Sequence, residues 1–366
     1  MLDHRPDVAE GCTFPSLPPV KLTAVSKIVV ASTPASGQVA GLLLVAGDLR
    51  RRGHHVTVLT GAEFRGWVLR AGVDFSPMPA GIVGGRAMTP AQFDAFCTAI
   101  VALRPESVIG DHLLLATLAR PADPLPSSAP LTVALGTSPP LDRLVRVPHH
   151  YLQLTVPSFA CPPVDAPPSF RFIGPLPEHA SLVRTVPAWW PTLWSGRTVV
   201  VVAQESAVGA DLLRLVVPAL HALAGIDVLV VAATGHVGSA ARLIDLEPDI
   251  PPNAVLAEDV PFDLLLPYAS ALVTSGGYNS VHTAIRSGTP MIVSADTDSG
   301  PQVAERVADC GIGVDLGDAF PSSDAIRDAV QTVVRSTRYR QRAAELRAEL
   351  TRFDALSAIA ATVAPQ

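Results

Sequence analysis

Short runs of β-branched residues alternate with longer segments of helical periodicity along most of this chain. The clearest run is TVVVVA at 198–203, and similar runs occupy 27–32 and 227–232. Uninterrupted apolar runs are typical of parallel strands, because the helices that connect such strands cover both faces of the sheet. The repeated strand–helix–strand order therefore predicts an α/β protein with parallel sheets and right-handed crossovers.

A proline-rich stretch separates two series of these strands and helices. Residues 121–191 hold 16 of the 35 prolines, which disfavours long helices there. A length of 366 residues is also suited to two hydrophobic cores. We therefore expect a flexible arm over 1–26, a first domain over 27–178, a linker over 179–196 and a second domain over 197–338.

The composition argues against several classes of protein. With 48% hydrophobic and 16% charged residues, the chain is too apolar to be disordered. A net charge of −6 argues against a nucleic-acid-binding surface. No apolar run reaches the ~18 residues that cross a membrane, and residues 1–26 lack the apolar core of a signal peptide. We expect a cytoplasmic protein with neither nucleic acid nor a membrane span among its partners.

The cysteines and histidines indicate no metal site. The four cysteines are far apart in sequence and form no CxxC pair, so neither a disulfide framework nor a zinc site is expected. The adjacent His149 and His150 are poor chelators without further ligands.

The most informative segment is TSGGYNS at 274–280. We expect a strand to end at Thr274 and a helix to begin at Ser280. Glycines between them let a ligand approach the backbone, and the N-terminus of a helix attracts phosphate. The same pattern also fits a tight turn with a serine N-cap and no ligand. Spacing alone leaves both interpretations open.

Several segments together resemble family 1 glycosyltransferases, which are inverting, metal-independent enzymes of bacterial natural-product pathways and of UDP-glycosyltransferases generally. The second half carries the specific motifs, at 260–269, 273–277, 288–291 and 311–314. The first half agrees at 27–38, 49–58, 152–157 and 172–175. The similarity covers residues 27–350.

This resemblance implies a GT-B fold, in which two Rossmann-like domains with parallel sheets face each other across a cleft. The first domain would bind a small-molecule acceptor, and the second would bind a UDP- or dTDP-sugar as co-substrate. A C-terminal helix over 339–366, part of a helical pattern that spans 337–363 if unbroken, would return to the first domain. No metal and no tightly bound cofactor are expected.

The resemblance also assigns donor-binding residues by position. Those facing the diphosphate would be Ser206, Ser275, Gly276, Gly277, Asn279 and Ser280. The backbone around Val260 would hold the nucleobase. The Asp–Gln pair that usually binds the donor sugar aligns with Ser299 and Gly300, and the nearby Asp298 and Gln302 are candidates to compensate.

The acceptor side departs from the family pattern. Gln38 stands where the family places a histidine base, and an amide cannot take a proton near neutral pH. Asp111 matches the acidic partner of that histidine, and His112 is an alternative base. Only about ten residues separate Pro140 from Tyr151, where the family has a long acceptor wall. Besides a glycosyltransferase with non-standard base catalysis, these departures allow a degenerate homologue that acts as a protein partner or homodimer, or a repurposed enzyme for another phosphorylated metabolite.

Overall fold

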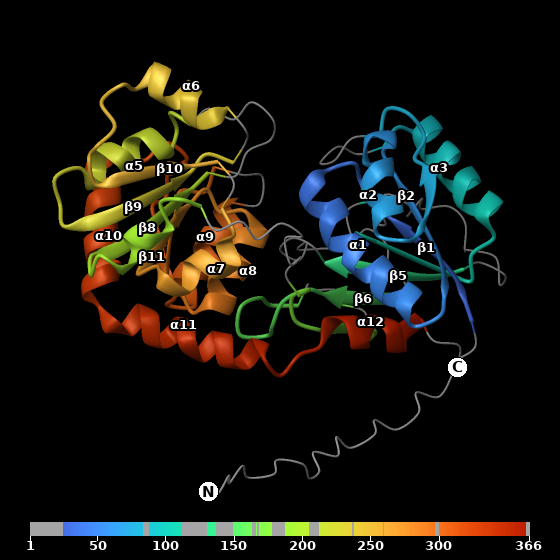
Figure 1. The fold of residues 1–366 in the computed structure, drawn as a ribbon. Helices are drawn as coiled ribbons and strands as arrows, with labels where there is room; N and C mark the ends of the chain where they lie inside the picture. Colours follow the sequence, from blue (N-terminus) through green and yellow to red (C-terminus); the bar gives the residue numbers. More distant parts are fainter. Residues whose placement is uncertain are drawn as a thin grey trace, which may run out of the picture.

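A computed structural model describes most of the chain as two lobes, each built around one parallel sheet (Figure 1). The described residues are 25–82, 88–111, 114, 130–136, 149–162, 166, 168–177, 187–204, 212–235, 238–258, 260–296 and 300–363. Among them, no helix is both long and apolar enough to cross a membrane.

The first lobe holds a seven-stranded sheet in the order β3-β2-β1-β4-β5-β6-β7. Its strands are β1 (Lys27–Ala31), β2 (His55–Thr60), β3 (Asp74–Pro77), β4 (Ser107–Asp111), β5 (Leu131–Gly136), β6 (His150–Gln153) and β7 (Phe170–Phe172). The α-helices between these strands, as far as the described residues go, are α1 (Ser36–Arg51), α2 (Arg65–Arg70) and α3 (Pro90–Leu103).

The second lobe holds a six-stranded sheet in the order β10-β9-β8-β11-β12-β13. Its strands are β8 (Thr198–Ala203), β9 (Val228–Ala233), β10 (Ala254–Ala257), β11 (Ala271–Thr274), β12 (Met291–Val293) and β13 (Gly313–Asp315). Its helices are α5 (Val216–Leu223), α6 (Ser239–Leu246), α7 (Phe262–Leu265), α8 (Tyr278–Ser287), α9 (Gly300–Asp309), α10 (Ser323–Arg335) and α11 (Thr337–Leu350).

When the strands of each sheet are counted in chain order, the first six lie in the doubly wound order 3-2-1-4-5-6, and the first sheet adds β7 at its edge. All strand pairings given for the two sheets are parallel. The valine run of β8 explains why this strand is central. Val199 and Val201 pack into the core on one face of the sheet, whereas Val200 and Val202 pack into the core on the other. The predicted α/β class with two Rossmann-like sheets is confirmed. In such sheets, ligands bind at the carboxyl ends of the strands, where the strand order reverses.

The chain crosses between the lobes more than once, and each crossing leaves a short segment in the other lobe's core. Val156 and Phe159, which follow β6, are buried in the core of the second lobe. In return, Ile359 and Val363 of α12 (Ala355–Val363) are buried in the core of the first lobe. Figure 1 shows α11 running beneath the second lobe and α12 beneath the first. The two lobes therefore share parts of their cores.

The helical pattern at 337–363 is interrupted, so a single unbroken helix is a wrong expectation. α11 ends at Leu350, and α12 begins at Ala355. Asp354 explains the restart, because its Oδ1 accepts a hydrogen bond from the Ser357 backbone N–H at 3.0 Å in the manner of an N-cap. This interaction holds the pKa of the Asp354 carboxyl below its ordinary value.

The helix that the sequence predicts at 208–224 begins later, at Val216. Residues 212–215 form turns, and 205–211 lie outside the described part. Pro218 accounts for the late start, because proline is tolerated in the first turn of a helix but not in its interior.

Candidate functional site at the junction of the lobes

The glycine turn after β11 leads directly into α8, at the carboxyl edge of the second sheet. Gly277 is the N-cap in extended conformation (φ −65°, ψ 135°), so the helix begins at Tyr278. Two sequence-based expectations are therefore wrong: Ser280 neither starts the helix nor caps it, because it is the third helical residue. As a glycine, Gly277 has no side chain to cover the first backbone N–H groups of α8, which suits an anion site.

Gly276 holds the turn in a shape that other residues rarely adopt. Its φ is +90°, and a Cβ added there would lie 2.9 Å from Val293 Cγ1 and 3.2 Å from Gly300 Cα. Ser275, next to it, is fully buried. The backbone at Gly276 is therefore packed against the end of β12 and the start of α9, with no room for a side chain.

Gln38 lies on the first turn of α1, at the carboxyl edge of the first sheet. Its Oε1 accepts a hydrogen bond from the Thr33 hydroxyl. Thr33 in turn contacts the fully buried Asp111, whose Oδ2 lies 3.4 Å from both the Thr33 N and Oγ1 atoms. The other carboxylate oxygen, Oδ1, accepts from the Leu114 backbone N–H at 2.8 Å. Thr33 thus links the two acceptor-side residues that the resemblance singles out.

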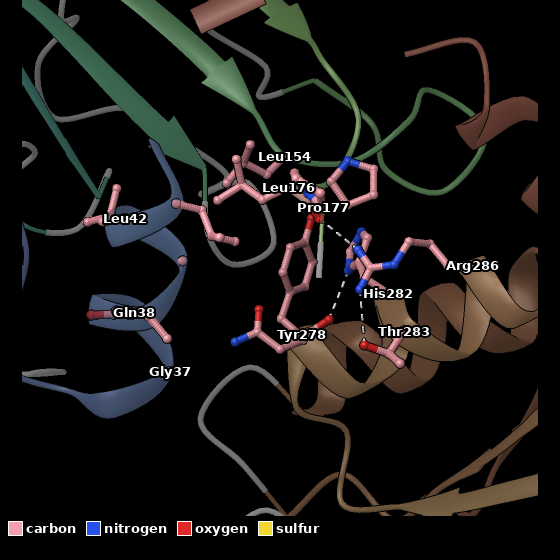
Figure 2. Close-up of a pocket in the computed structure, with 15 residues that line it drawn as sticks. Gly37, Gln38, Leu42, Leu154, Leu176, Pro177, Tyr278, His282, Thr283 and Arg286 are labelled. Carbon is pink, nitrogen blue, oxygen red and sulfur yellow. Dashed lines mark hydrogen bonds between the residues drawn. The ribbon is translucent and has the colours of Figure 1, made fainter. Parts of the chain in front are cut away.

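A cavity of about 210 Å³ lies between α1 of the first lobe and α8 of the second (Figure 2). Its lining includes Gly37, Gln38 and Gly41 from α1, Tyr278, Asn279 and Arg286 from α8, and Leu154, Leu176 and Pro177 from the chain between. A Cβ added at Gly37 would lie 3.3 Å from Asn279 Nδ2. Gln38 and Asn279 thus line one cavity, although the sequence places them on different domains.

A chain of hydrogen bonds in the wall of this cavity joins α8 to the segment that follows β6. His282 Nδ1 lies 2.8 Å from the Tyr278 carbonyl oxygen, so the ring donates there. Its Nε2, 2.7 Å from Thr155 Oγ1, therefore accepts the threonine proton. Thr155 also bonds the Tyr278 hydroxyl, which accepts from Gln153 Nε2 at 3.1 Å. These bonds fix the start of α8 relative to the first lobe.

Burial keeps this network uncharged. It lowers the pKa of His282 to about 4, and the charge of Arg286 lowers it further while the bond to the Tyr278 carbonyl opposes the shift. Burial also raises the pKa of the Tyr278 hydroxyl well above its usual value. Although His282 lines the cavity, its side chain is only 4% exposed and both of its ring nitrogens are hydrogen-bonded, so we assign this neutral imidazole a structural role.

Arg286 ties the same helix to the chain that leaves β7. Its Nη1 donates to the Leu176 carbonyl oxygen at 2.8 Å, and its Nη2 donates to Thr283 Oγ1 at 3.2 Å. Figure 2 shows Tyr278, His282 and Arg286 on the face of α8 that meets Leu154, Leu176 and Pro177. One face of α8 thus packs at the junction of the lobes, while the N-terminus of this helix lies at the carboxyl edge of the second sheet.

The remaining predicted residues divide into two groups. Val260 is buried in the core beside the second sheet, and Gln302 is exposed on α9. His112, Ser206, Asp298 and Ser299 lie outside the described residues. Among the residues that the structure does describe, no group of three or more histidine, cysteine, aspartate or glutamate side chains could hold a metal ion.

The sequence reasoning missed Thr33, Gln153, Thr155 and His282. For His282 a signal was available: Tyr278 and His282 are four residues apart, so they share one face of the helix that follows the glycines. Thr33 gives no such signal, because its partner Asp111 is 78 residues away in sequence.

Comparison with known proteins identifies the class of this molecule. The glycosyltransferase of kitacinnamycin superposes with a TM-score of 0.73 at 20% identity, covering 93% of this chain and 98% of that one. Spinosyn rhamnosyltransferase SpnG, solved with thymidine diphosphate, superposes with a TM-score of 0.72 at 19% identity, covering 92% and 99%. The fold is that of the GT-B glycosyltransferases.

Sequence relatives establish the family. Residues 219–359 match the C-terminal domain of erythromycin biosynthesis protein CIII-like proteins. The 4'-demethylrebeccamycin synthase of Lentzea aerocolonigenes is 32% identical, over 90% of this chain and 97% of its own length. UDP-glucosyltransferase B1 of Starmerella bombicola is 28% identical, over 92% and 97%. The chain belongs to the EryCIII-type family of GT-B glycosyltransferases, enzymes that transfer a sugar from a nucleotide-sugar donor.

Proposed function

We propose that this enzyme transfers a sugar from a UDP- or dTDP-sugar to a small natural-product acceptor, bound where the two lobes meet. The observation that carries the proposal is the shared cavity, which brings Gln38 of the first lobe close to the N-terminal turn of α8. The names of the relatives support both substrates, since they include a rebeccamycin synthase, a UDP-glucosyltransferase and a spinosyn rhamnosyltransferase with bound thymidine diphosphate.

On the donor side, the diphosphate would lie at the N-terminus of α8, with Gly276, Gly277, Asn279 and Ser280 around it and Ser275 and Ser206 nearby. The positive end of the helix dipole would stabilise the negative charge that grows on the leaving diphosphate. We assign the nucleobase to the backbone around Val260 and the sugar to Asp298, Ser299 and Gln302. No metal ion is needed for this charge stabilisation.

On the acceptor side, the Gln38 amide would orient the attacking group without removing its proton. Thr33, held by Asp111, fixes the Gln38 oxygen. The acceptor must then be acidic enough to lose its proton readily, or pass it to another base, for which His112 is the candidate. The atypical glutamine thus selects for acceptors of low pKa.

Nucleotide binding tests the donor site. UDP or dTDP at 100 times its dissociation constant should stabilise the folded protein by about 2.7 kcal/mol in a thermal-shift measurement. Uridine and thymidine, which lack the diphosphate, serve as matched controls and should give a much smaller shift. If neither diphosphate stabilises the protein, the proposal is wrong. Binding of the intact donor sugar with no transfer to any acceptor would instead favour an auxiliary role.

Restoring the histidine tests the acceptor side. In the wild type, where Gln38 removes no proton, only the ionised acceptor reacts. Its kcat/KM should therefore rise about tenfold per pH unit up to the acceptor's own pKa. Gln38→His should add general-base catalysis, worth about 10²–10⁴, and level off above a pH near 6.5, the ordinary pKa of histidine. Gln38→Ala is the control and should keep the original pH profile. Identical profiles for Gln38 and Gln38→His would contradict the assignment.

A further inference from the structure

A partly buried ion pair joins separate segments at the carboxyl edge of the second sheet. Arg214 Nη1 lies 2.6 Å from Asp296 Oδ1, and the Asp296 side chain is only 10% exposed. The Arg214 guanidinium also stacks 4.3 Å from the centre of the Phe320 ring. Arg214 precedes α5, Asp296 follows β12, and Phe320 precedes α10, so this contact clamps together loops from across the sheet edge.

A more exposed ion pair in the same lobe serves as a comparison for the Arg214–Asp296 pair. Arg197 and Asp227 are 3.3 Å apart, and Asp227 is 92% exposed. Water screens such a pair, and holding two exposed side chains together has an entropic cost, so it contributes little. The Arg214–Asp296 pair is shorter, and its aspartate is far better shielded than Asp227, although Arg214 at 40% is about as exposed as Arg197. An aromatic ring also covers one side of the Arg214 guanidinium. This pair is therefore suited to fix the conformation of a loop.

The backbone next to Asp296 is strained at one residue. Ala295, its neighbour, has φ +58°, a left-handed conformation that residues with a Cβ rarely adopt. Strain of this kind persists only where surrounding contacts enforce it, and such positions cluster at functional sites. The ion pair made by the Asp296 carboxylate, one residue away, is a contact that can hold Ala295 in this conformation.

Ala295 is connected to the glycine turn before α8 by two successive backbone contacts. A Cβ added at Gly300 would lie 2.7 Å from the Ala295 carbonyl carbon, so the two ends of the loop touch. A Cβ added at Gly276 would lie 3.2 Å from Gly300 Cα. The contacts therefore run from Asp296 through Ala295 and Gly300 to Gly276.

We propose that Arg214 and Asp296 are positioning residues for donor binding. Their ion pair holds the Ala295 loop against Gly300, and Gly300 then supports the backbone of Gly276 beneath the diphosphate. Neither side chain needs to touch the donor. The inference rests on the proposed function, since it assigns the diphosphate to the Gly276 turn.

The test is a double-mutant cycle read out by dTDP and UDP affinity in isothermal titration calorimetry. Asp296→Asn keeps the shape of the side chain and removes its charge, and Arg214→Gln removes the partner. Each change should weaken nucleotide binding about tenfold, with a matching rise in the donor KM and an unchanged acceptor KM. Because both act through one pair, the double variant should also lose about tenfold.

Wild-type affinity in the single variants would overturn the inference, and so would a hundredfold loss in the double variant, since independent effects multiply. The matched control is Arg197→Gln, which breaks the exposed pair and should leave nucleotide affinity unchanged.

A second measurement separates this inference from the proposed function. Amide hydrogen exchange in peptides covering Gly276 and Gly300 should be at least fivefold faster in Asp296→Asn than in the wild type without nucleotide. Unchanged exchange would overturn the positioning role. If the wild type binds neither nucleotide but Asp296→Asn still exchanges faster, the proposed donor site is wrong. The link between the ion pair and the glycine turn is then retained.

Discussion

Burial of His282 contributes a pH dependence to the stability of this enzyme. The folded-state pKa of His282 is about 4, below the ordinary 6.5 of an unfolded chain. Between those values the unfolded state binds a proton that the folded state does not, so stability is full above pH 6.5 and is lost as the pH falls toward 4. Each pKa unit corresponds to about 1.4 kcal/mol, so the effect of this one residue is on the order of 3 kcal/mol.

Urea unfolding at several pH values measures this effect. We expect the wild type to lose about 2 kcal/mol of unfolding free energy between pH 7 and pH 5 through His282. His282→Gln should be less stable at pH 7 and lose distinctly less on acidification. His55→Gln, at an exposed position, is the control and should retain the wild-type pH dependence. If the unfolding free energies of His282→Gln and the wild type fell equally between pH 7 and pH 5, burial of the His282 imidazole would not oppose its protonation.

Side-chain partnerships are the part of the site that sequence reasoning could not supply. The resemblance placed Gln38 and Asp111 on the acceptor side, but it gave no means of finding Thr33 between them. Thr155 and His282 are 127 residues apart, and only the packing of one lobe on the other makes them neighbours. A polar residue in the middle of a buried helix face needs a partner, but the sequence does not say which partner.

Most of the elements were predictable because local periodicity decides them. Valine-rich runs identified the central strands. The sequence also predicts a helix over 90–103, which is where α3 lies, with Thr89 and Gln92 forming a capping box. The start of α8 was not predictable, because it depends on the extended conformation of Gly277, which glycine permits without requiring. The break before α12 was missed because helical periodicity continues across the Asp354 cap.

The glycine turn before α8 gives a prediction at the scale of an element. Gly276→Ala would introduce a Cβ at φ +90° and 2.9 Å from Val293 Cγ1, which forces the turn to shift. We expect a loss of roughly 2–3 kcal/mol in unfolding free energy and much weaker dTDP binding, measured by calorimetry.

Gly225→Ala is the matched control. Gly225 has φ +71°, but nothing lies within 4 Å of an added Cβ. It should therefore show a smaller loss of about 1 kcal/mol from backbone strain alone and wild-type affinity for dTDP. Equal losses in the two variants would show that packing against the β12 loop is unimportant for the turn.

The exchange of core segments couples the stabilities of the two lobes. Ile359 of α12 is 1% exposed and lies in the core of the first lobe, although α12 follows the last helix of the second lobe. Where the crossing chains meet, Gly174 has φ +76°, and a Cβ added there would lie 2.5 Å from Phe353 Cβ. Neither lobe therefore has a complete core without a segment that the other lobe contributes.

Truncating one contributed side chain tests this coupling. Ile359→Ala should cost about 2–4 kcal/mol, since it leaves a cavity in a close-packed core, and should lower the melting temperature of the whole molecule in one calorimetric transition. Ala361→Ser, on the exposed side of the same helix, should have little effect. If the first lobe alone melts early while the second keeps its wild-type transition, the lobes are independent.

The shared cores also define how this enzyme could be recombined with its relatives. A chimaera joined at one point between the sheets would separate Val156 and Phe159 from the second core and α12 from the first, so both halves would meet mismatched surfaces. A functional graft of a new donor half must carry the 156–160 segment with it and leave 355–363 behind. The donor-binding half that we propose is therefore discontinuous in the gene, although it is compact in space.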